Sequence, residues 1–323
     1  MIMIKNKNIL VAGGAGFIGT HLVETLLSQN NFISIIDNFN NYYSGKEENI
    51  KTSTQNYILN KDYEVIRGDL LDVKIFSKIS VDIDIIFNLA AQAGVRYSIE
   101  HPIKVSRNNI LSALNILNYA LNSNIKKLVY ASTSSVYGNP VYTPVDESHP
   151  KNPISPYSIS KLCGEFYVDY YYREFNLSTT SLRFYTVYGP RGRPDMAIRK
   201  FFELILGNKE ITIYGEGNQK RDFTYVSDII DGLILACESP KSVGEVFNLG
   251  CSNPIILNDL IDKMYEITNK SKKLKKVEKQ KGDVDITHAD ITKAQKMLNY
   301  HPKVDIDTGL RKTYEWQLKK LNI

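Results

Sequence analysis

The stretch Gly13-Gly14-Ala15-Gly16-Phe17-Ile18-Gly19 decides how the first part of this chain folds. Residues Asn8 to Ala12 precede it and form a short apolar run, which is typical of a buried parallel strand. In the segment that follows, Phe17 to Leu27, apolar residues recur at helical spacing. The glycines therefore lie at a turn that leads from a strand into a helix.

Three of these glycines each suit one requirement of such a turn. Gly13 can adopt the tight turn, Gly16 lets the backbone approach a diphosphate closely, and Gly19 lets the helix pack on the sheet. The start of the helix, at Phe17 and Ile18, offers free N–H groups and a positive dipole end to phosphates. The motif predicts a loop that holds the pyrophosphate of a dinucleotide.

Further apolar runs also end in polar or small residues. The run Phe32 to Ile36 ends in Asp37, whose carboxylate is placed to accept hydrogen bonds from an adenosine ribose and to repel a 2′-phosphate. This acid favours NAD over NADP. The next two runs end in Gly68-Asp69-Leu70, expected near the adenine, and in Asn88 to Ala91. These residues are expected at the carboxyl edge of a parallel sheet, with a ligand lying across it.

Strand and helix patterns alternate up to about residue 180, which predicts an α/β fold with a doubly wound parallel sheet. Long helices are expected over Val105–Leu121 and Pro156–Glu174. After Gly189, prolines, glycines and arginines cluster and the elements become short. We expect a Rossmann-type NAD-binding domain over residues 1–180 and a smaller substrate lobe over 181–323. Elements within about 222–250 are expected to return to the first domain.

The composition is that of an ordinary globular protein: 323 residues, 43% hydrophobic, with a net charge of +5. No basic run with interleaved aromatics indicates a nucleic-acid partner. No apolar run reaches the roughly 18 residues of a membrane span, and no signal peptide is evident at the start. Cys163, Cys237 and Cys251 show no CxxC spacing, so we expect reduced, buried thiols in a cytoplasmic protein, and no metal site is predicted.

A second constellation indicates oxidation of an alcohol. Tyr157 and Lys161 are four residues apart, so they share one face of the expected helix. An ammonium group near a phenol lowers the pKa of the phenol, and the phenolate can then take the proton of a substrate hydroxyl while hydride leaves its carbon. Thr133 is placed to hydrogen-bond the same hydroxyl, and Ser134 and Ser135 continue the hydroxyl cluster.

These motifs resemble the extended short-chain dehydrogenase/reductase family, in its nucleotide-sugar branch, over essentially the whole chain. The motifs are the glycine turn, the Asn88–Ala91 tetrad, Asn109, Val136-Tyr137-Gly138, the Tyr157/Lys161 pair and Arg221-Asp222-Phe223-Thr224-Tyr225-Val226. The resemblance implies NAD contacts from Gly13, Gly16, Phe17, Ile18, Gly19, Asp37, Asn38, Asn40, Asp69, Leu70, Leu89, Ala90, Ala91, Asn109, Tyr157, Lys161 and Tyr185. It implies substrate contacts from Gln92, Arg96, Thr133, Tyr157, Thr186, Arg193, Tyr214, Arg221 and Asp283. In that branch, the positions of Arg221 and Asp283 hold the nucleotide diphosphate and ribose.

The resemblance also narrows the reaction. Nucleotide-sugar 4,6-dehydratases carry Asp-Glu after the active-site threonine, whereas this chain has Ser134-Ser135, which cannot do that acid/base work. Three segments, 37–43, 90–98 and 184–197, look like UDP-glucuronate 4-epimerases, and Gln280 agrees with them. A uronate carries a carboxylate on C6, and the loop with Arg191 and Arg193 offers a bidentate clamp for it, Arg193 being the better candidate.

The resemblance therefore predicts NAD-dependent interconversion of UDP-glucuronate and UDP-galacturonate. The alternatives are a 4-epimerase for UDP-glucose or UDP-N-acetylglucosamine, a UDP-glucuronate decarboxylase, and a non-catalytic NAD-binding regulator. A homodimer is also expected, because the two long helices pair across such an interface in similar proteins. Residues expected under the partner are Ile110, Leu114, Leu117, Phe166, Tyr170 and Phe175.

Overall fold

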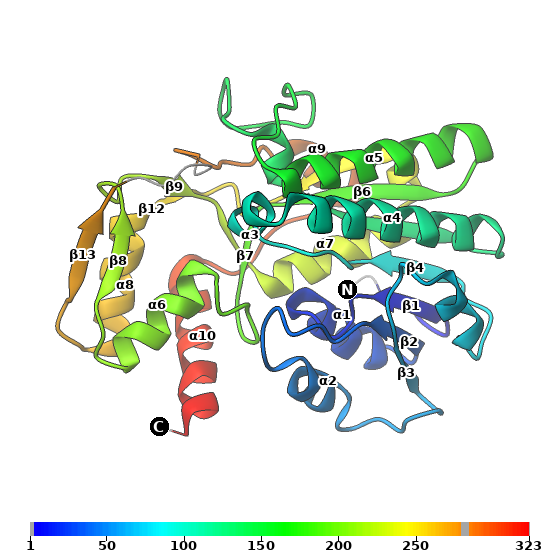
Figure 1. Ribbon diagram of the computed structural model, residues 1–323, viewed down its shortest axis with the longest axis horizontal. Coiled ribbons are helices and arrows are strands. Elements are labelled where there is room, and N and C mark those ends of the chain that lie inside the picture. Colours follow the sequence, from blue (N-terminus) through cyan, green and yellow to red (C-terminus); the bar gives the residue numbers. More distant parts are fainter. Residues whose placement is uncertain (1–2, 279–283, 323) are drawn as a thin grey trace.

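A parallel sheet forms the centre of the molecule (Figure 1). The computed structural model describes residues 3–278 and 284–322, and within them the sheet has seven strands in the order β11-β6-β5-β4-β1-β2-β3. The strands are β1 (Asn8–Ala12), β2 (Phe32–Asp37), β3 (Tyr63–Arg67), β4 (Ile85–Asn88), β5 (Lys127–Thr133), β6 (Thr179–Phe184) and β11 (Glu245–Leu249). The order reverses between β1 and β4, which makes the sheet doubly wound, as the alternating sequence pattern predicts.

Helices cover both faces of this sheet. Alternate residues of β1 explain this: Ile9 and Val11 pack into one apolar core, while Leu10 and Ala12 pack into another. The first core contains residues of α1 (Phe17–Leu27), α2 (Lys46–Thr54) and α7 (Val226–Glu238). The second contains residues of α4 (Pro102–Leu121) and α5 (Pro156–Phe175), and the short α3 (Val95–Glu100) precedes α4. A strand buried on both faces has a continuous apolar sequence, which is what residues 9–12 show.

The later part of the chain builds a smaller lobe beside the carboxyl edge of the sheet, on the left of Figure 1. Its elements are β7 (Thr186–Tyr188), α6 (Ala197–Leu206), β8 (Ile211–Tyr214), β9 (Lys220–Arg221), β10 (Phe223–Tyr225), β12 (Ile255–Ile256), α8 (Leu257–Thr268), β13 (Leu274–Val277) and α10 (Ile306–Leu321). The chain also returns to the first domain. It does so through α7, through β11, which pairs with β6 in the central sheet, and through α9 (Thr292–Leu298), which packs near β11 and α7.

The expected dimer face needs a correction. Helix α4 begins at Pro102, three residues earlier than predicted, because proline suits the first position of a helix. Leu117 is 1% exposed and lies in the core under α4, so no partner can cover it. Phe166, Tyr170 and Phe175 on α5 are exposed, as are Ile103 and Leu111 on α4. The homodimer itself stays a prediction.

The cysteines also differ from expectation in one respect. All three are free thiols, but only Cys237 is buried, whereas Cys163 and Cys251 are partly exposed. In the described part of the chain, no helix is both long enough and apolar enough to cross a membrane.

Candidate active site

A cavity of about 1190 Å³ opens at the carboxyl edge of the sheet, between the two lobes. All the predicted cofactor, substrate and catalytic residues within the described part of the chain line it. They come from the loops after β1, β2, β3, β4 and β5, from α4 and α5, and from β7, β8 and β9 of the smaller lobe. Asp283 and Gln280 lie outside the described residues. The fold thus brings together positions that are more than 200 residues apart in sequence.

The glycine turn at the floor of the cavity has no room for side chains. Gly13 has a φ of +78°, and a Cβ there would lie 2.8 Å from the backbone nitrogen of Ala90. A Cβ on Gly19 would lie 2.3 Å from the carbonyl oxygen of Gly13, so α1 packs directly against the turn. Gly16 is less crowded, since a Cβ there would lie 3.1 Å from that oxygen. The turn therefore exposes backbone to the cavity at the start of α1.

Asp37 lies beside this turn, at the end of β2. Its carboxylate accepts hydrogen bonds from the backbone N–H groups of Ala15, at 3.2 Å, and Phe39, at 2.8 Å. Lys46, which sequence reasoning missed, places its ammonium group 3.6 Å from Asp37 Oδ1 and donates to Asn40 Oδ1 at 3.0 Å. Asp37 therefore connects the glycine turn to the loop before α2.

Local sequence fixes where α5 begins. Ser155 and Ser158 form a capping box, in which each side chain accepts a hydrogen bond from the other residue's backbone N–H. Pro156 occupies the first helical position. This puts Tyr157 in the first turn, at the mouth of the sheet, and Lys161 one turn further along the same face.

The electrostatics of the pair differ from expectation. Burial raises the pKa of Tyr157, and the charge of Arg193 and a hydrogen bond with Thr133 offset this only in part. Burial lowers the pKa of Lys161 to about 7, and the nearby Glu165 carboxylate acts in the opposite direction. Desolvation of each group thus dominates over attraction between them. In the chain alone, the expected lowering of the Tyr157 pKa by Lys161 is not found.

The hydroxyl cluster follows directly from the end of β5. Thr133 caps a short 3-10 turn, Ser134–Tyr137, and its Oγ1 accepts from the backbone N–H of Ser135 at 3.2 Å. The same atom lies 3.2 Å from Ser135 Oγ. Because Thr133 also contacts the Tyr157 hydroxyl, the phenol and two alcohol groups face one region of the cavity.

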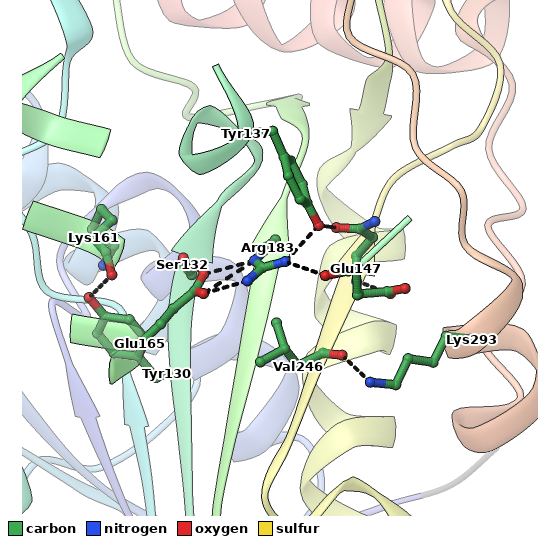
Figure 2. A network of polar contacts seen from close by, with 10 residues as sticks. Tyr130, Ser132, Tyr137, Glu147, Lys161, Glu165, Arg183, Val246 and Lys293 are labelled. Carbon is green, nitrogen blue, oxygen red and sulfur yellow. Dashed lines mark hydrogen bonds and ion pairs between the residues drawn. The ribbon is translucent and has the colours of Figure 1, made fainter. Parts of the chain in front are cut away.

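A buried ion pair lies behind this region (Figure 2). Glu165 is four residues beyond Lys161 on α5, and its Oε2 lies 2.7 Å from an Arg183 guanidinium nitrogen. Ser132 donates a hydrogen bond to the same carboxylate, and Arg183 also donates to the Tyr137 hydroxyl at 2.8 Å. The network joins α5 to β5 and β6 beneath the active site. Only the four-residue spacing of Glu165 from Lys161 signals it in the sequence.

The structure distinguishes the two loop arginines. Arg191 points away from the cavity: its guanidinium lies 2.8 Å from His21 Nδ1 and 2.5 Å from Glu24 Oε2, both on α1. Arg193 lines the cavity, and its charge acts on the pKa of Tyr157. Of the pair, Arg193 is therefore the one placed to contact a substrate. It is already paired with Asp195, a residue that sequence reasoning missed.

Two buried polar groups near the cavity have no partner among the described residues. They are Gln92 Nε2 and the Tyr185 hydroxyl. Asn109 holds the backbone of Gln92 at both ends, accepting from its N–H at 2.7 Å and donating to its carbonyl at 3.2 Å. Buried groups of this kind cost free energy unless something hydrogen-bonds to them, which is the signature expected of a site built for a polar ligand.

Cationic side chains of α3 and of the smaller lobe form one wall of the cavity. The Arg96 guanidinium lies 4.9 Å from the ring centroid of Tyr214. Arg221 donates to the carbonyl of Val284 at 2.7 Å and also lines the cavity. Lys200 and Lys209 line it as well. This wall suits an anionic group such as a diphosphate.

Comparisons with known proteins agree with this geometry. Residues 10–313 match a family model described as GDP-mannose 4,6 dehydratase. A UDP-glucuronate 4-epimerase of Arabidopsis thaliana is 38% identical, with 96% of this chain and 75% of that protein covered. The crystal structure of UDP-glucuronic acid 4-epimerase from Bacillus cereus with UDP-glucuronic acid and NAD is 36% identical, with a TM-score of 0.90 and 97% and 99% of the two chains covered.

A third relative has another named substrate. The UDP-N-acetylglucosamine 4-epimerase from Methanobrevibacter ruminantium, solved with UDP-N-acetylmuramic acid, is 32% identical with a TM-score of 0.89, covering 98% of this chain and 100% of that one. The chain thus belongs to the extended short-chain dehydrogenase/reductase family. Within it, the comparisons support nucleotide-sugar 4-epimerase activity. The NAD expected from the sequence is the cofactor in the Bacillus cereus structure.

Proposed function

We propose that this protein interconverts UDP-glucuronate and UDP-galacturonate. The observation that carries the proposal is the position of Arg193, which lines the same cavity as Tyr157 and acts on the pKa of its phenol. A guanidinium close to the catalytic phenol suits a sugar whose C6 carboxylate lies next to the reacting part of the ring. Thr186, at the start of β7, adds a hydroxyl to the same wall.

The residues present fit NAD. The crowded glycines leave a cradle that no side chain fills, and Asp37 lies beside it at the end of β2. The unpartnered hydroxyl of Tyr185 gives a polar contact further along the cavity. When bound, NAD would accept the hydride from C4 of the sugar and give it back.

The chain's own groups perform the proton chemistry. Tyr157 takes the proton of the C4 hydroxyl as the alcohol becomes a ketone, and returns it when the alcohol forms again. Thr133 contacts the Tyr157 hydroxyl and is placed to hold the same substrate oxygen. Lys161, kept in place by burial beneath the Tyr157 turn, stabilises the phenolate when its own ammonium form is present.

The C6 carboxylate of the oxidised sugar must also be held in place, to prevent its loss as CO₂. A 4-keto uronate is a β-keto acid, which loses CO₂ when its C5–C6 bond aligns with the carbonyl π system. We infer that Arg193 and Thr186 hold the carboxylate so that this bond is out of alignment whenever the 4-keto sugar is docked for hydride transfer, before and after it turns to offer its other face. Arg221, which lines the same cavity, is the residue we assign to the diphosphate, so that the sugar turns about a fixed nucleotide.

Dehydration, the reaction in the description of the family model, does not fit the residues that follow Thr133. Ser134 and Ser135 occupy the positions after Thr133 where that reaction needs an acid and a base. A 4-epimerase for neutral UDP-hexoses is the second candidate. The observation that favours it is Asp195, which already neutralises Arg193.

One assay separates these functions. The purified protein is mixed with UDP-glucuronate, UDP-glucose or UDP-N-acetylglucosamine, and the sugar products are followed by NMR. We expect UDP-galacturonate from UDP-glucuronate at the highest rate. A pentose product would indicate a decarboxylase, a faster reaction with a neutral sugar would indicate the second candidate, and no product from any of the three would indicate a non-catalytic protein.

A further inference from the structure

Arg193, the arginine that we assign to the C6 carboxylate of the sugar, already binds a carboxylate of the chain itself. Arg193 Nε donates to Asp195 Oδ1 at 3.0 Å, and a terminal guanidinium nitrogen donates to Asp195 Oδ2 at 2.5 Å. Asp195 therefore occupies one edge of the guanidinium fork in the bidentate arrangement that a ligand carboxylate would also adopt.

The two partners differ in exposure. The side chain of Arg193 is 18% exposed, whereas that of Asp195 is 45% exposed. Apart from Arg193, the Asp195 carboxylate accepts a long hydrogen bond from the Tyr42 hydroxyl, at 3.4 Å, and one from its own backbone N–H. Asp195 can thus turn toward solvent at small cost, but Arg193 cannot follow it. An arginine that is mostly buried requires a carboxylate partner more than an exposed aspartate requires an arginine.

Among the described residues, Asp195 is the one carboxylate that pairs with Arg193. The ring of Tyr42 lies 5.6 Å from its guanidinium, and Tyr97 packs against Tyr42 with 5.0 Å between ring centroids. The charge of Arg193 also acts on Tyr43 and Tyr157. The Arg193–Asp195 ion pair is therefore close enough to Tyr157 to affect the electrostatics of the reacting centre.

We propose that Asp195 is a specificity-determining residue that competes with the C6 carboxylate of a UDP-uronate for Arg193. This inference rests on the proposed function and deepens it. When the uronate binds, its carboxylate takes over Arg193 and Asp195 turns toward solvent. When the 4-keto sugar turns, Asp195 takes Arg193 back, so the guanidinium always has a partner.

Two consequences follow from this exchange. The resident carboxylate weakens uronate binding, because the incoming anion meets a neutral pair and not a lone cation. It also speeds the turning of the sugar, because the substrate carboxylate leaves an arginine that is immediately neutralised. A neutral UDP-hexose does not take part in the exchange and is insensitive to it.

The test is the Asp195→Asn variant, which keeps the shape and one acceptor oxygen but removes the charge. Affinities for UDP-glucuronate, UDP-glucose and UDP are measured by calorimetry in a Tyr157→Phe background, so that the sugar is not converted. We expect UDP-glucuronate to bind about three- to tenfold more tightly, the scale of one partly exposed charge contact. Binding of UDP-glucose and UDP should stay within about twofold.

Kinetics with Tyr157 intact provide the second readout. The Asp195→Asn variant should show a lower KM and a severalfold lower kcat for UDP-glucuronate, because the sugar is released more slowly from Arg193. Asp195→Glu, which restores the charge, should recover the wild-type values. Asp262→Asn is the matched control, because Asp262 forms an exposed ion pair with Lys272 outside the cavity. NAD content and melting temperature are recorded for each variant.

The outcomes distinguish this inference from the proposed function. If Asp195→Asn binds UDP-glucuronate no better, or more weakly, the competition is refuted and Asp195 merely orients Arg193. An equal gain for UDP-glucose would also refute it. If the wild-type protein makes no UDP-galacturonate but the selective gain in uronate binding is still present, the proposed function fails and the competition stands.

Discussion

Glu165, one helical turn beyond Lys161 on α5, forms a buried ion pair with Arg183 on β6, with 2.7 Å between the charged atoms and side chains 5% and 2% exposed. The pair fastens the catalytic helix α5 to strand β6. The pair contributes little net free energy to folding, because the desolvation of both charges offsets the attraction between them. Replacing only one of the two residues is strongly destabilising, because the charge of the other residue then stays buried without a partner.

We therefore expect Glu165→Gln to lower the free energy of unfolding by about 3–5 kcal/mol, the typical cost of removing one member of a buried pair. Urea denaturation measures this. The double variant Glu165→Met with Arg183→Met should recover much of the loss, because it leaves no buried charge alone. A double variant as unstable as the sum of the two single ones would contradict this account of the pair.

Tyr157→Phe tests the assignment of the base. The phenyl ring keeps the packing at the start of α5 but removes the group that takes the substrate proton. Activity should fall by about 10²–10⁴-fold, the usual contribution of a general base, while NAD and UDP-sugar still bind. Steady-state rates and calorimetry measure the two effects. A variant within about tenfold of wild type would mean that another group takes the proton.

The titration of Lys161 makes the free energy of unfolding depend on pH, and the direction of this dependence follows from its lowered pKa. Its pKa is lowered by burial from 10.5 to about 7, so between these values the folded chain releases a proton that the unfolded chain keeps. The contribution of this group to the free energy of unfolding therefore rises with pH from about 7 to 10.5, and its full burial cost acts below pH 7.

Lys161→Met removes that dependence. In cofactor-free protein, the variant should be more stable relative to wild type at pH 6.5 than at pH 9.5, as urea denaturation at about these two values would measure. Lys127, whose pKa burial lowers to about 8, titrates in the same range but is present in both proteins. A stability difference that does not change with pH would refute the lowered pKa.

Asp37→Ala tests the cofactor preference. The carboxylate beside the glycine turn is expected to hold a ribose and repel a 2′-phosphate, so the variant should retain less NAD and discriminate less against NADP. Cofactor content after purification and titration with both dinucleotides measure this. Glu47→Gln is a matched control, because Glu47 is an exposed acid on α2 that pairs with Arg67. Unchanged NAD retention and preference in Asp37→Ala would exclude the role.

Arg193→Ala tests the clamp on the C6 carboxylate. We expect epimerisation of UDP-glucuronate to be lost and a measurable fraction of 4-keto-pentose product to appear through loss of CO₂ from the 4-keto uronate, with the hydride retained as reduced cofactor on the protein. NMR and absorbance of the reduced cofactor follow both. Arg191→Ala is the matched control: it removes a neighbouring arginine bound to His21 and Glu24, so it should change stability but not the product. Clean UDP-galacturonate from Arg193→Ala, with weaker binding only, would reduce Arg193 to an affinity contact.

Local patterns in the sequence determined much of this protein. The strand, turn and helix around Gly13 to Gly19, the doubly wound order, and the presence of Tyr157 and Lys161 on one helix face follow from periodicity and from residues with restricted conformations. Such features depend on neighbours in the chain, so they can be predicted without knowing what packs against them. Every predicted site residue in the described part of the chain lies on one cavity, because the parallel strands end at one edge and the smaller lobe lies beside that edge.

Only the tertiary structure decided the charges at the site. Sequence spacing placed Lys161 near Tyr157 but could not give the burial that lowers the pKa of the lysine and raises that of the phenol. The sequence placed Arg191 and Arg193 on one loop and favoured Arg193 only through the resemblance. The structure gives the physical reason: Arg191 pairs with Glu24 on α1, whereas Arg193 lines the cavity and pairs with Asp195. The physical reason is that desolvation and ion pairing depend on which groups meet across the fold, and this is fixed by the packing of the whole chain.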